Sequence, residues 1–339
     1  MISLYRWQPG QGRGTWVDSP DLPTDGRLTK GEVWWLDLEN ASEEEEALVF
    51  QKFLPVHPLT LEDVTHPRRE PGSAPHFPKA EEFADYLFVI ANPLRPVCDM
   101  DPVGAQADLA CAVVQLSAVL THQVLITHHY QVLPAIANVK QFLLRHAEQG
   151  GRGPDYLFHL VLDNLVDEFA PEIDRLVLQL DEIEEVVFDR PSQQLLADLI
   201  HLKRRVIALR KTLILMREVL ARLTRGEFKL VEAREIAYYR NVFDHLVRYT
   251  ELIEGAREMV SDLMQTHLAA ASNKLNGIMK GLALVSTVIL PMSLIASVYG
   301  MNFKEMPEIE WKYGYPFALG LMVLVAVVCV AVFFRKRWL

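Results

Sequence analysis

The sequence predicts an α/β domain at the N-terminus, a long helical region after it and two transmembrane helices at the C-terminus. Three observations carry this prediction. Residues before about 150 alternate β-branched and aromatic segments with short helical patterns. Residues after 155 place apolar side chains at helical spacing. The C-terminal part contains two long apolar segments, 281–300 and 315–334, that carry no charge.

The N-terminal domain, residues 1–153, is predicted to hold strands separated by short helices. Ser42 followed by Glu45 forms a capping-box pattern, which predicts that a helix starts there. The stretch 67–78 contains four prolines and is predicted to be a loop. The predicted strands are 32–38, 85–91, 108–116 and 119–127, and the further helices are 59–64 and 134–149.

The middle domain, residues 154–275, is predicted to consist of helices only. One helix is expected over 155–188 and a second over 193–223, with Ser192 as its N-cap. A third is expected to start near Val231 and to continue without a breaker to Pro291 and on to Tyr299, so that it enters the third domain. The first two helices carry mainly acidic and mainly basic side chains respectively, which predicts solvated, paired faces.

The third domain, residues 276–339, is predicted to span a membrane twice. The two charge-free segments are 281–300 and 315–334, each about 30 Å long as a helix, which is the thickness of the hydrocarbon layer. Buried helices of a soluble protein are the alternative. Two such segments joined by the loop 301–314 favour membrane spans.

Basic residues predict the orientation of the two spans. Lys274 and Lys280 lie just before the first span, and Arg335, Lys336 and Arg337 lie just after the second. Together they are expected to form a basic collar at one side of the membrane. The connecting loop carries three acids, Glu305, Glu308 and Glu310, which either concentrate cations or only solvate the loop. Because positively charged ends stay on the cytoplasmic side, both termini and the whole of 1–275 are expected in the cytoplasm.

The charge and motif content exclude several function classes. The net charge of −10 argues against a nucleic-acid partner, since phosphate binding needs Lys and Arg. The charge divides into −13 over residues 1–275 and +3 over the remainder, where 6 basic residues face 3 acidic ones. No phosphate-binding loop, nucleophile elbow or calcium loop occurs, so we expect neither an enzyme nor a bound cofactor. The eleven histidines lack metal-site spacing and are expected at the surface or hydrogen-bonded in the core.

The end of the first span carries the most specific motif of the chain. Tyr299-Gly300-Met301-Asn302 runs into Phe303 and then Met306-Pro307-Glu308. With the loop WKYGYP at 311–316, the tail RKRWL at 335–339 and the segment SNKLNGIMK at 272–280, this sequence resembles the CorA family of divalent-cation channels. The resemblance covers at least residues 155 to 339.

The resemblance implies a homopentameric funnel in the bacterial inner membrane, with a cytosolic αβα sandwich and the first span of each copy lining a pore. Gly300, Met301 and Asn302 would form the selectivity filter, where Asn302 receives hydrated Mg²⁺, with Co²⁺ and Ni²⁺ as further candidate ions. A ring of carboxamides suits this role, because Mg²⁺ gives up its water reluctantly and an amide holds that water without trapping the ion. The only partners expected are further copies of the chain, the lipid bilayer and the transported ions.

Helical spacing identifies the expected pore-lining stripe. Small, polar and apolar residues fall on one face of the first span and its approach. The larger apolar ones would be constrictions that close the pore by excluding water. Leu282 flanks this stripe and matches a pore position of the family. The expected pore-lining residues are Asn276, Met279, Leu282, Ala283, Ser286, Leu290 and Ser293.

One position departs from the family pattern. The family senses cytosolic Mg²⁺ with carboxylates between subunits, and this chain has Asn241 where an Asp is common. Because an amide is a weaker Mg²⁺ ligand than a carboxylate, we expect a weaker or altered sensing site. The remaining candidate ligands are Asp244, Asp99 and Asp101.

Two other functions remain open on the sequence. The related ZntB branch moves Zn²⁺, with protons as the coupled ion, and typically carries a variant of the Gly-Met-Asn triplet. A membrane-anchored sensor or scaffold with a vestigial pore is the third possibility. Met301 argues against the ZntB branch, and Asn302 with the mixed-polarity stripe argues against the scaffold.

Overall fold

The structure is a computed structural model that describes residues 1–10, 14–18, 20–23, 28–70, 73–95, 113–188, 192–301 and 311–336. By their internal contacts these residues fall into two compact units. The first comprises Met1–Val186 and Ser192–Met264, and the second Val187–Pro191 and Gln265–Leu339. Each unit is described by itself.

A seven-stranded mixed sheet organises the N-terminal part, in the order β2-β1-β3-β7-β6-β5-β4. Its central pair, β3 and β7, is parallel, and the other pairs are antiparallel. β3, β5, β6 and β7 are apolar and buried, which fits the middle of a sheet covered on both faces. The strands are β1 Ile2–Trp7, β2 Gly14–Asp18, β3 Val33–Glu39, β4 Lys79–Glu82, β5 Leu87–Ala91, β6 Leu116–Leu120 and β7 Val124–His129.

The predicted strands near 32–38 and 85–91 are confirmed. Residues 108–112 of the predicted strand 108–116 lie outside the described residues, and the prediction of one strand over 119–127 is wrong. β6 starts at Leu116 and β7 at Val124. The segment 119–127 contains a hairpin turn, in which Thr121 N–H donates to Val124 O at 2.8 Å. Strands β1, β2 and β4 were not predicted. The sequence pattern of β4 is weak, because β4 is a short, charged strand at the edge of the sheet.

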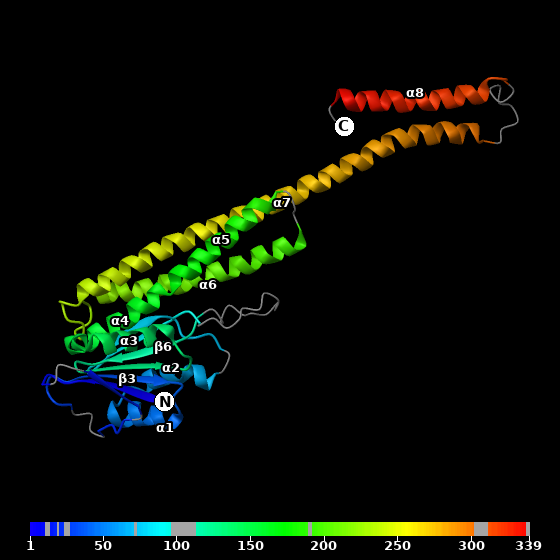
Figure 1. The fold of residues 1–339 in the computed structure, drawn as a ribbon. Coiled ribbons are helices and arrows are strands. Elements are labelled where there is room, and N and C mark those ends of the chain that lie inside the picture. The colour runs from blue at the N-terminus through cyan, green and yellow to red at the C-terminus, as the bar shows by residue number, and fades with distance from the viewer. Residues whose placement is uncertain are drawn as a thin grey trace. The chain divides into compact units, whose positions relative to one another are not determined.

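Helices cover both faces of the sheet (Figure 1). Trp34, Leu36 and Leu38 of β3 share one apolar cluster with Val49 and Phe50 of the segment that follows α1. The opposite face packs against α3 and α4. The covering helices are α1 Glu43–Ala47, the π-helix η1 Leu48–Phe53, α2 Pro58–Arg69, α3 Pro134–Arg145 and the 3-10 helix η3 Ala147–Arg152. This arrangement is the expected αβα sandwich.

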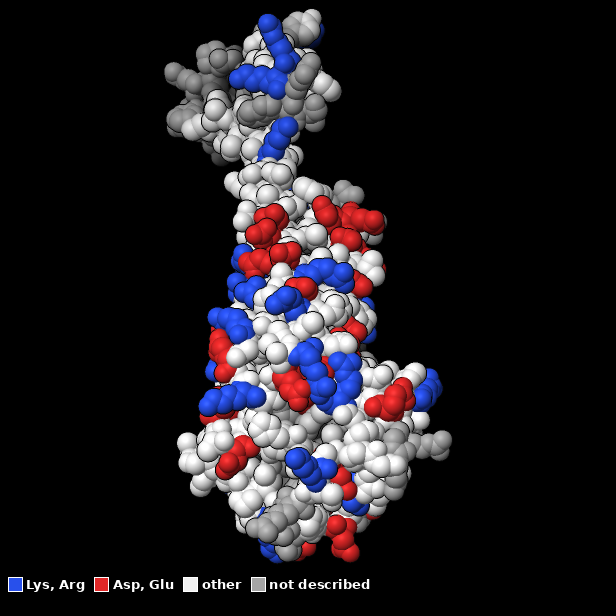
Figure 2. Space-filling view, turned by 90° about the vertical axis from the view of Figure 1, so that its left-hand side faces the viewer, with Lys and Arg blue, Asp and Glu red and all other residues white. Residues whose placement is uncertain are grey.

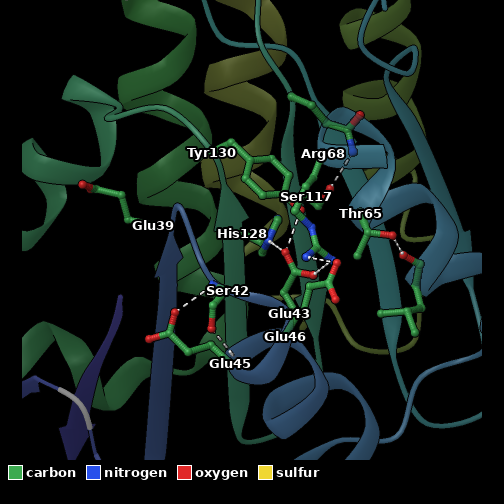
Figure 3. Close-up of polar contacts among 12 residues, drawn as sticks. Glu39, Ser42, Glu43, Glu45, Glu46, Thr65, Arg68, Ser117, His128 and Tyr130 are labelled. Carbon is green, nitrogen blue, oxygen red and sulfur yellow. Dashed lines mark hydrogen bonds and ion pairs between the residues drawn. The ribbon is translucent and has the colours of Figure 1, made fainter. Parts of the chain in front are cut away.

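The capping box at the start of α1 is confirmed. Ser42 Oγ accepts a hydrogen bond from Glu45 N–H at 3.3 Å, and Glu45 Oε2 accepts one from Ser42 N–H at 2.9 Å (Figure 3). Two orphan amide groups of the first helical turn are thereby satisfied.

Helix α2 corrects the prediction of a loop from residue 67. It continues through Pro67 to Arg69. A proline inside a helix leaves the carbonyl four residues before it without a donor. Gln115 Nε2 donates to that carbonyl, Asp63 O, at 2.8 Å, so a side chain next to β6 replaces the missing amide.

Long helices follow the sheet. The predicted helix over 155–188 is divided at Glu168 into α4 Pro154–Asp167 and α5 Phe169–Val187. Helix α6, Gln193–Thr224, starts at the predicted N-cap, where Ser192 Oγ accepts from Leu195 N–H at 3.1 Å. Acidic and basic side chains alternate over the surface of these helices (Figure 2). Arg205 of α6 pairs with Glu172 of α5 at 2.5 Å, so the two helices are joined as expected.

Helix α7 is one uninterrupted element of 64 residues, Ile236–Tyr299. It starts later than the predicted Val231, because the preceding residues form turns. Glu235 N–H donates to Glu232 O, and Tyr238 N–H donates to Glu235 O, both at 2.9 Å. Tyr239, Val242 and Leu246 are fully buried in the first unit. Helix α8 is Gly314–Arg335. Both α7 and α8 are long and apolar enough to cross a membrane, by length and composition.

Candidate functional site

The C-terminal part of α7 carries the predicted pore-lining residues and a proline. Pro291 lies within it, and α7 continues through that position. The carbonyl that loses its donor is that of Thr287. The Cys329 thiol of α8 lies 4.0 Å from Thr287 O, and Thr287 Oγ1 donates to Ala283 O at 2.7 Å. A thiol of the neighbouring helix therefore lies at the limit of hydrogen-bond distance from the carbonyl that Pro291 leaves without a donor.

Helix α8 covers one side of α7. Leu284, Val288 and Ile289 of α7 line an apolar recess together with Val330 and Phe333 of α8. At 100° per residue, Ala283, Leu290 and Ser293 point to the opposite side of α7. The described part of the chain places no helix on that side, and Met279, Leu282 and Leu290 are exposed. Asn276, Ala283 and Ser293 are exposed as well, and Ser286 is partly exposed. The predicted stripe thus lies on an uncovered face of α7, although Val285 and Ile289 beside the recess are 55% and 53% exposed as well.

The end of α7 is tightly wound at the start of the predicted filter. Gly300 N–H donates to Ala296 O at 3.0 Å and to Ser297 O at 3.2 Å, and Met301 N–H donates to Val298 O at 3.3 Å. A Cβ atom on Gly300 would lie 3.3 Å from Ala296 O, so a side chain there would crowd the backbone. Met301 is 45% exposed. Asn302 and the three loop acids, Glu305, Glu308 and Glu310, lie outside the described residues.

Aromatic side chains mark the start of α8. Trp311 packs against Tyr313 and Phe317, with ring centroids 6.2 and 5.7 Å apart. The backbone also turns here, since Gly314 N–H donates to Trp311 O at 2.9 Å. Trp and Tyr are the residues that prefer the membrane–water interface, so this cluster is suited to anchor the end of a span.

The predicted basic collar is only partly within the described residues. Lys274, Lys280, Arg335 and Lys336 are exposed, and Arg337 lies outside the described part of the chain. Because these four side chains are exposed, their charged groups can contact solvent or lipid headgroups.

Only part of the candidate sensing site lies within the described residues. Asp244 and Asn241 are exposed on α7, while Asp99 and Asp101 lie outside the described residues. A different acidic group lies next to Asp244. Asp167 of α4 pairs with His245 of α7 at 3.3 Å, and burial, followed by the charge of Asp167, raises the pKa of Asp163. The sequence contained a sign of this acidic group, because Asp163 and Asp167 are four residues apart and therefore lie on one face of a helix.

Histidines of β7 are buried and bonded, as expected. His129 Nε2 lies 3.1 Å from Asp37 Oδ1, and His128 Nε2 lies 3.2 Å from Glu46 Oε1. Asp37, Glu39 and His129 place ligand atoms within 4.8 Å of one another. Lys140 Nζ lies 2.7 Å from Asp37 Oδ2, so an ammonium group already neutralises this cluster.

The comparisons with known proteins decide the family. The family model of the CorA-like Mg²⁺ transporter protein matches residues 30–337. This chain belongs to that family.

Relatives of this chain match it over different lengths. The cobalt/magnesium transport protein CorA of Thermotoga maritima is 30% identical over 305 residues, which cover 90% of this chain and 83% of the relative. The magnesium transport protein CorA of Haemophilus influenzae is 45% identical over 86 residues, covering 25% of this chain and 27% of the relative. The solved structure of the CorA magnesium transporter from Methanocaldococcus jannaschii has the same fold, with a TM-score of 0.81, 18% identity and coverage of 100% of this chain and 99% of that one.

Proposed function

We propose that this chain forms a membrane channel for divalent cations, with Mg²⁺ as its main ion and Co²⁺ and Ni²⁺ as further candidates. The observation that carries the proposal is the face of α7 opposite α8. It combines small, polar and apolar side chains, remains uncovered and leads to Gly300 and Met301. Membership of the CorA-like family supports the same function, and relatives named for magnesium or cobalt transport support the choice of ion.

A conducting pore needs several copies of this chain, because one α7 and one α8 enclose no channel. Five copies, the number that the family resemblance implies, would place the stripe from Asn276 to Ser293 around a common axis. Asn302 of each copy would then form the outer ring. Its carboxamides would hydrogen-bond the water shell of the ion, which Mg²⁺ exchanges reluctantly.

The three domains would have different roles in the channel. Residues 1–153 and 154–275 would form the cytosolic funnel, and residues 276–339 the transmembrane domain of an inner-membrane protein of bacteria. The basic residues that flank the spans support cytoplasmic termini. The −13 charge of the segment 1–275 would attract cations on the cytoplasmic side, while the collar from Lys274 to Lys280 and from Arg335 to Arg337 would oppose their passage.

Ion uptake into proteoliposomes tests this function. Wild-type protein is expected to admit Mg²⁺ with and without a proton uncoupler, and Asn302→Ala is expected to lower the initial rate at least about tenfold, because the ring loses its hydrogen bonds to the water shell. Asn138→Ala, which alters an exposed asparagine of α3, is the matched control and should leave the rate unchanged.

The same vesicles separate the alternatives. Competition with Co²⁺, Ni²⁺ and Zn²⁺ orders the ions. Zn²⁺ uptake that requires a pH gradient would replace the proposal by proton-coupled zinc transport. Absence of flux for every divalent ion, with intact oligomer, would leave a sensor or scaffold.

A further inference from the structure

The apolar recess between α7 and α8 is open on one side. Its lining is entirely apolar and includes Leu284 and Val288 of α7 and Phe333 of α8. Figure 1 shows α8 running beside this part of α7. The recess encloses about 310 Å³, which is within the range of small-molecule sites. Val285 and Ile289 beside it are 55% and 53% exposed, so a ligand can enter from the surroundings of the two helices.

The recess lies where the two predicted spans reach one edge of the hydrocarbon layer. Leu284 is three residues after the predicted start of the first span at residue 281, and Phe333 is one residue before the predicted end of the second at residue 334. An apolar cavity of this kind stays free of water. Because the surrounding solvent at this depth is hydrocarbon, a lipid acyl chain is the apolar group available to fill the recess.

Two lysines lie at one end of the recess. Lys280 is four residues before Leu284, and Lys336 is three residues after Phe333. Each lysine is therefore about one helical turn from a residue that lines the recess. Since α8 returns antiparallel to α7 (Figure 1), both lysines lie at the same end, and both side chains are exposed.

The transmembrane part of the chain supplies no anion to this end of the recess. Beyond residue 262 the only acidic residues are Glu305, Glu308 and Glu310, in the loop that joins the opposite ends of the spans. The transmembrane helices of a second copy would thus bring no carboxylate to the two lysines. Phosphate groups of lipids are the anions at this depth, and basic pockets between transmembrane helices on the cytoplasmic side bind anionic headgroups.

We propose that the recess binds an acyl chain of an anionic phospholipid, whose phosphate group pairs with Lys280 and Lys336. This site requires that α7 and α8 lie in a membrane, but it does not require that the chain conducts ions. Lipid binding to the purified protein therefore tests it separately from the proposed function.

Native mass spectrometry of the full-length protein in detergent measures lipid retention. Phosphatidylglycerol, which is anionic, and phosphatidylcholine, which is zwitterionic, are added at equal concentration. Wild-type protein is expected to retain phosphatidylglycerol at least about fivefold more, because lysines near the membrane surface attract anionic headgroups.

A substitution that fills the recess tests the place of the acyl chain. Val288→Trp is expected to lower the retention of phosphatidylglycerol at least about fivefold, because the indole occupies the recess. Val328→Trp is the matched control. It makes the same change at an exposed residue of α8 on the face opposite Val330, so it should retain the lipid as wild type does.

Neutral substitutions test the headgroup contact. The double variant Lys280→Gln/Lys336→Gln is expected to lose the preference for phosphatidylglycerol and to retain phosphatidylcholine as wild type does, since the acyl site is unchanged. Lys312→Gln changes an exposed lysine beside the opposite end of α8 and should keep the preference.

Several outcomes would overturn the proposal. One is equal retention of the two lipids by the wild type, and another is unchanged retention of phosphatidylglycerol in folded Val288→Trp. Loss of the oligomer in Val288→Trp with the lipid still bound would assign the recess to a helix of another copy. An unaltered preference in Lys280→Gln/Lys336→Gln would contradict the headgroup contact. Circular dichroism verifies folding, and Val288→Phe replaces Val288→Trp if the latter does not fold.

Discussion

Glu46 is a heavily bonded buried carboxylate on the sheet face covered by α1. Its Oε1 accepts from Tyr130 OH at 2.6 Å and lies 3.2 Å from His128 Nε2, and its Oε2 accepts from Arg68 Nη2 at 2.7 Å (Figure 3). The side chain is 3% exposed, so none of these donors could be replaced by bulk water. Arg68 also pairs with Glu43, which connects α1 to α2.

Removal of the Glu46 carboxylate is therefore expected to destabilise the protein. Glu46→Ala leaves the phenol of Tyr130 and the imidazole of His128 without their acceptor, which costs about 1 to 3 kcal/mol, while Arg68 keeps its ion pair with Glu43. Thermal unfolding of the purified protein, followed by circular dichroism, measures the effect. Glu44→Ala changes an exposed glutamate of the same helix and should alter the midpoint little.

Glu168 gives the stability of the first unit a pH dependence. It lies at the break between α4 and α5, and burial raises the pKa of its carboxyl group to about 7, against the effect of a hydrogen bond from the Ala135 backbone. Because the pKa is higher in the folded protein than in the unfolded chain, its contribution to stability is complete below about pH 4.5. This contribution is lost as the pH rises through 7.

Glu168→Gln is expected to remove this pH dependence. The amide keeps an acceptor for Ala135 N–H but carries no charge, so the variant should be more stable than wild type by about 1 to 2 kcal/mol at pH 8 and no more stable at pH 4.5. Unfolding midpoints at the two pH values measure the difference. Glu185→Gln, at an exposed glutamate of α5, is the control, and an equal gain there would contradict the assignment to Glu168.

At the scale of the helix, two prolines are accommodated in the same way. Pro67 lies inside α2 and Pro291 inside α7. In both cases a side chain from a neighbouring element lies at the carbonyl that lost its donor. Gln115 Nε2 is 2.8 Å from Asp63 O, and Cys329 Sγ is 4.0 Å from Thr287 O. In α2 the side chain of Gln115 thus replaces the missing donor, and in α7 a thiol lies at the limit of hydrogen-bond distance from the corresponding carbonyl.

A double-mutant cycle tests this explanation in α2. Gln115→Ala is expected to cost about 1 to 3 kcal/mol, because it leaves the buried carbonyl of Asp63 without a donor. In the background of Pro67→Ala, where residue 67 again has an amide, Gln115→Ala should cost clearly less. Urea unfolding of the four proteins gives the coupling free energy, and a coupling near zero would contradict the explanation.

At the scale of the whole molecule, the uncovered face of α7 indicates how copies would assemble. Leu284 and Val288 line a recess with α8, whereas Leu290 on the opposite side is 67% exposed and Ser286 is partly exposed. In the proposed channel the predicted stripe would face water or another copy, while the opposite side of α7 would face α8 and lipid. The two sides of one helix are therefore expected to differ in access to water-soluble reagents.

Cysteine labelling in proteoliposomes measures that difference. In a background without Cys98, Cys111 and Cys329, a cationic thiol reagent is expected to label Ser286→Cys and Leu290→Cys and to lower Mg²⁺ flux by most of its value, because the adduct narrows the pore and adds positive charge. Leu284→Cys, on the α8 side, should remain unlabelled. Labelling of Leu284→Cys with Leu290→Cys protected would place the pore on the opposite face.

The sequence by itself determined the features that depend on local composition and period. The uninterrupted α7, the capping box at Ser42 and the N-cap at Ser192 follow from neighbouring residues, and the structure confirms each of them. The two segments predicted to span a membrane lie in α7 and α8, which are long and apolar enough to do so. The Gly300-Met301-Asn302 triplet indicated the family that the comparisons then showed. The limits of β6 and β7 were not predictable in this way, since the same apolar residues suit a strand or a hairpin turn.

The tertiary structure decided which distant residues meet. It gave the carbonyl groups of Asp63 and Thr287 their partners and set α8 against one face of α7. The helical period gives the faces of α7 but not which of them a second helix will cover. The physical reason is that these contacts join residues far apart in the chain, whose proximity depends on how whole elements pack and not on the residues next to them.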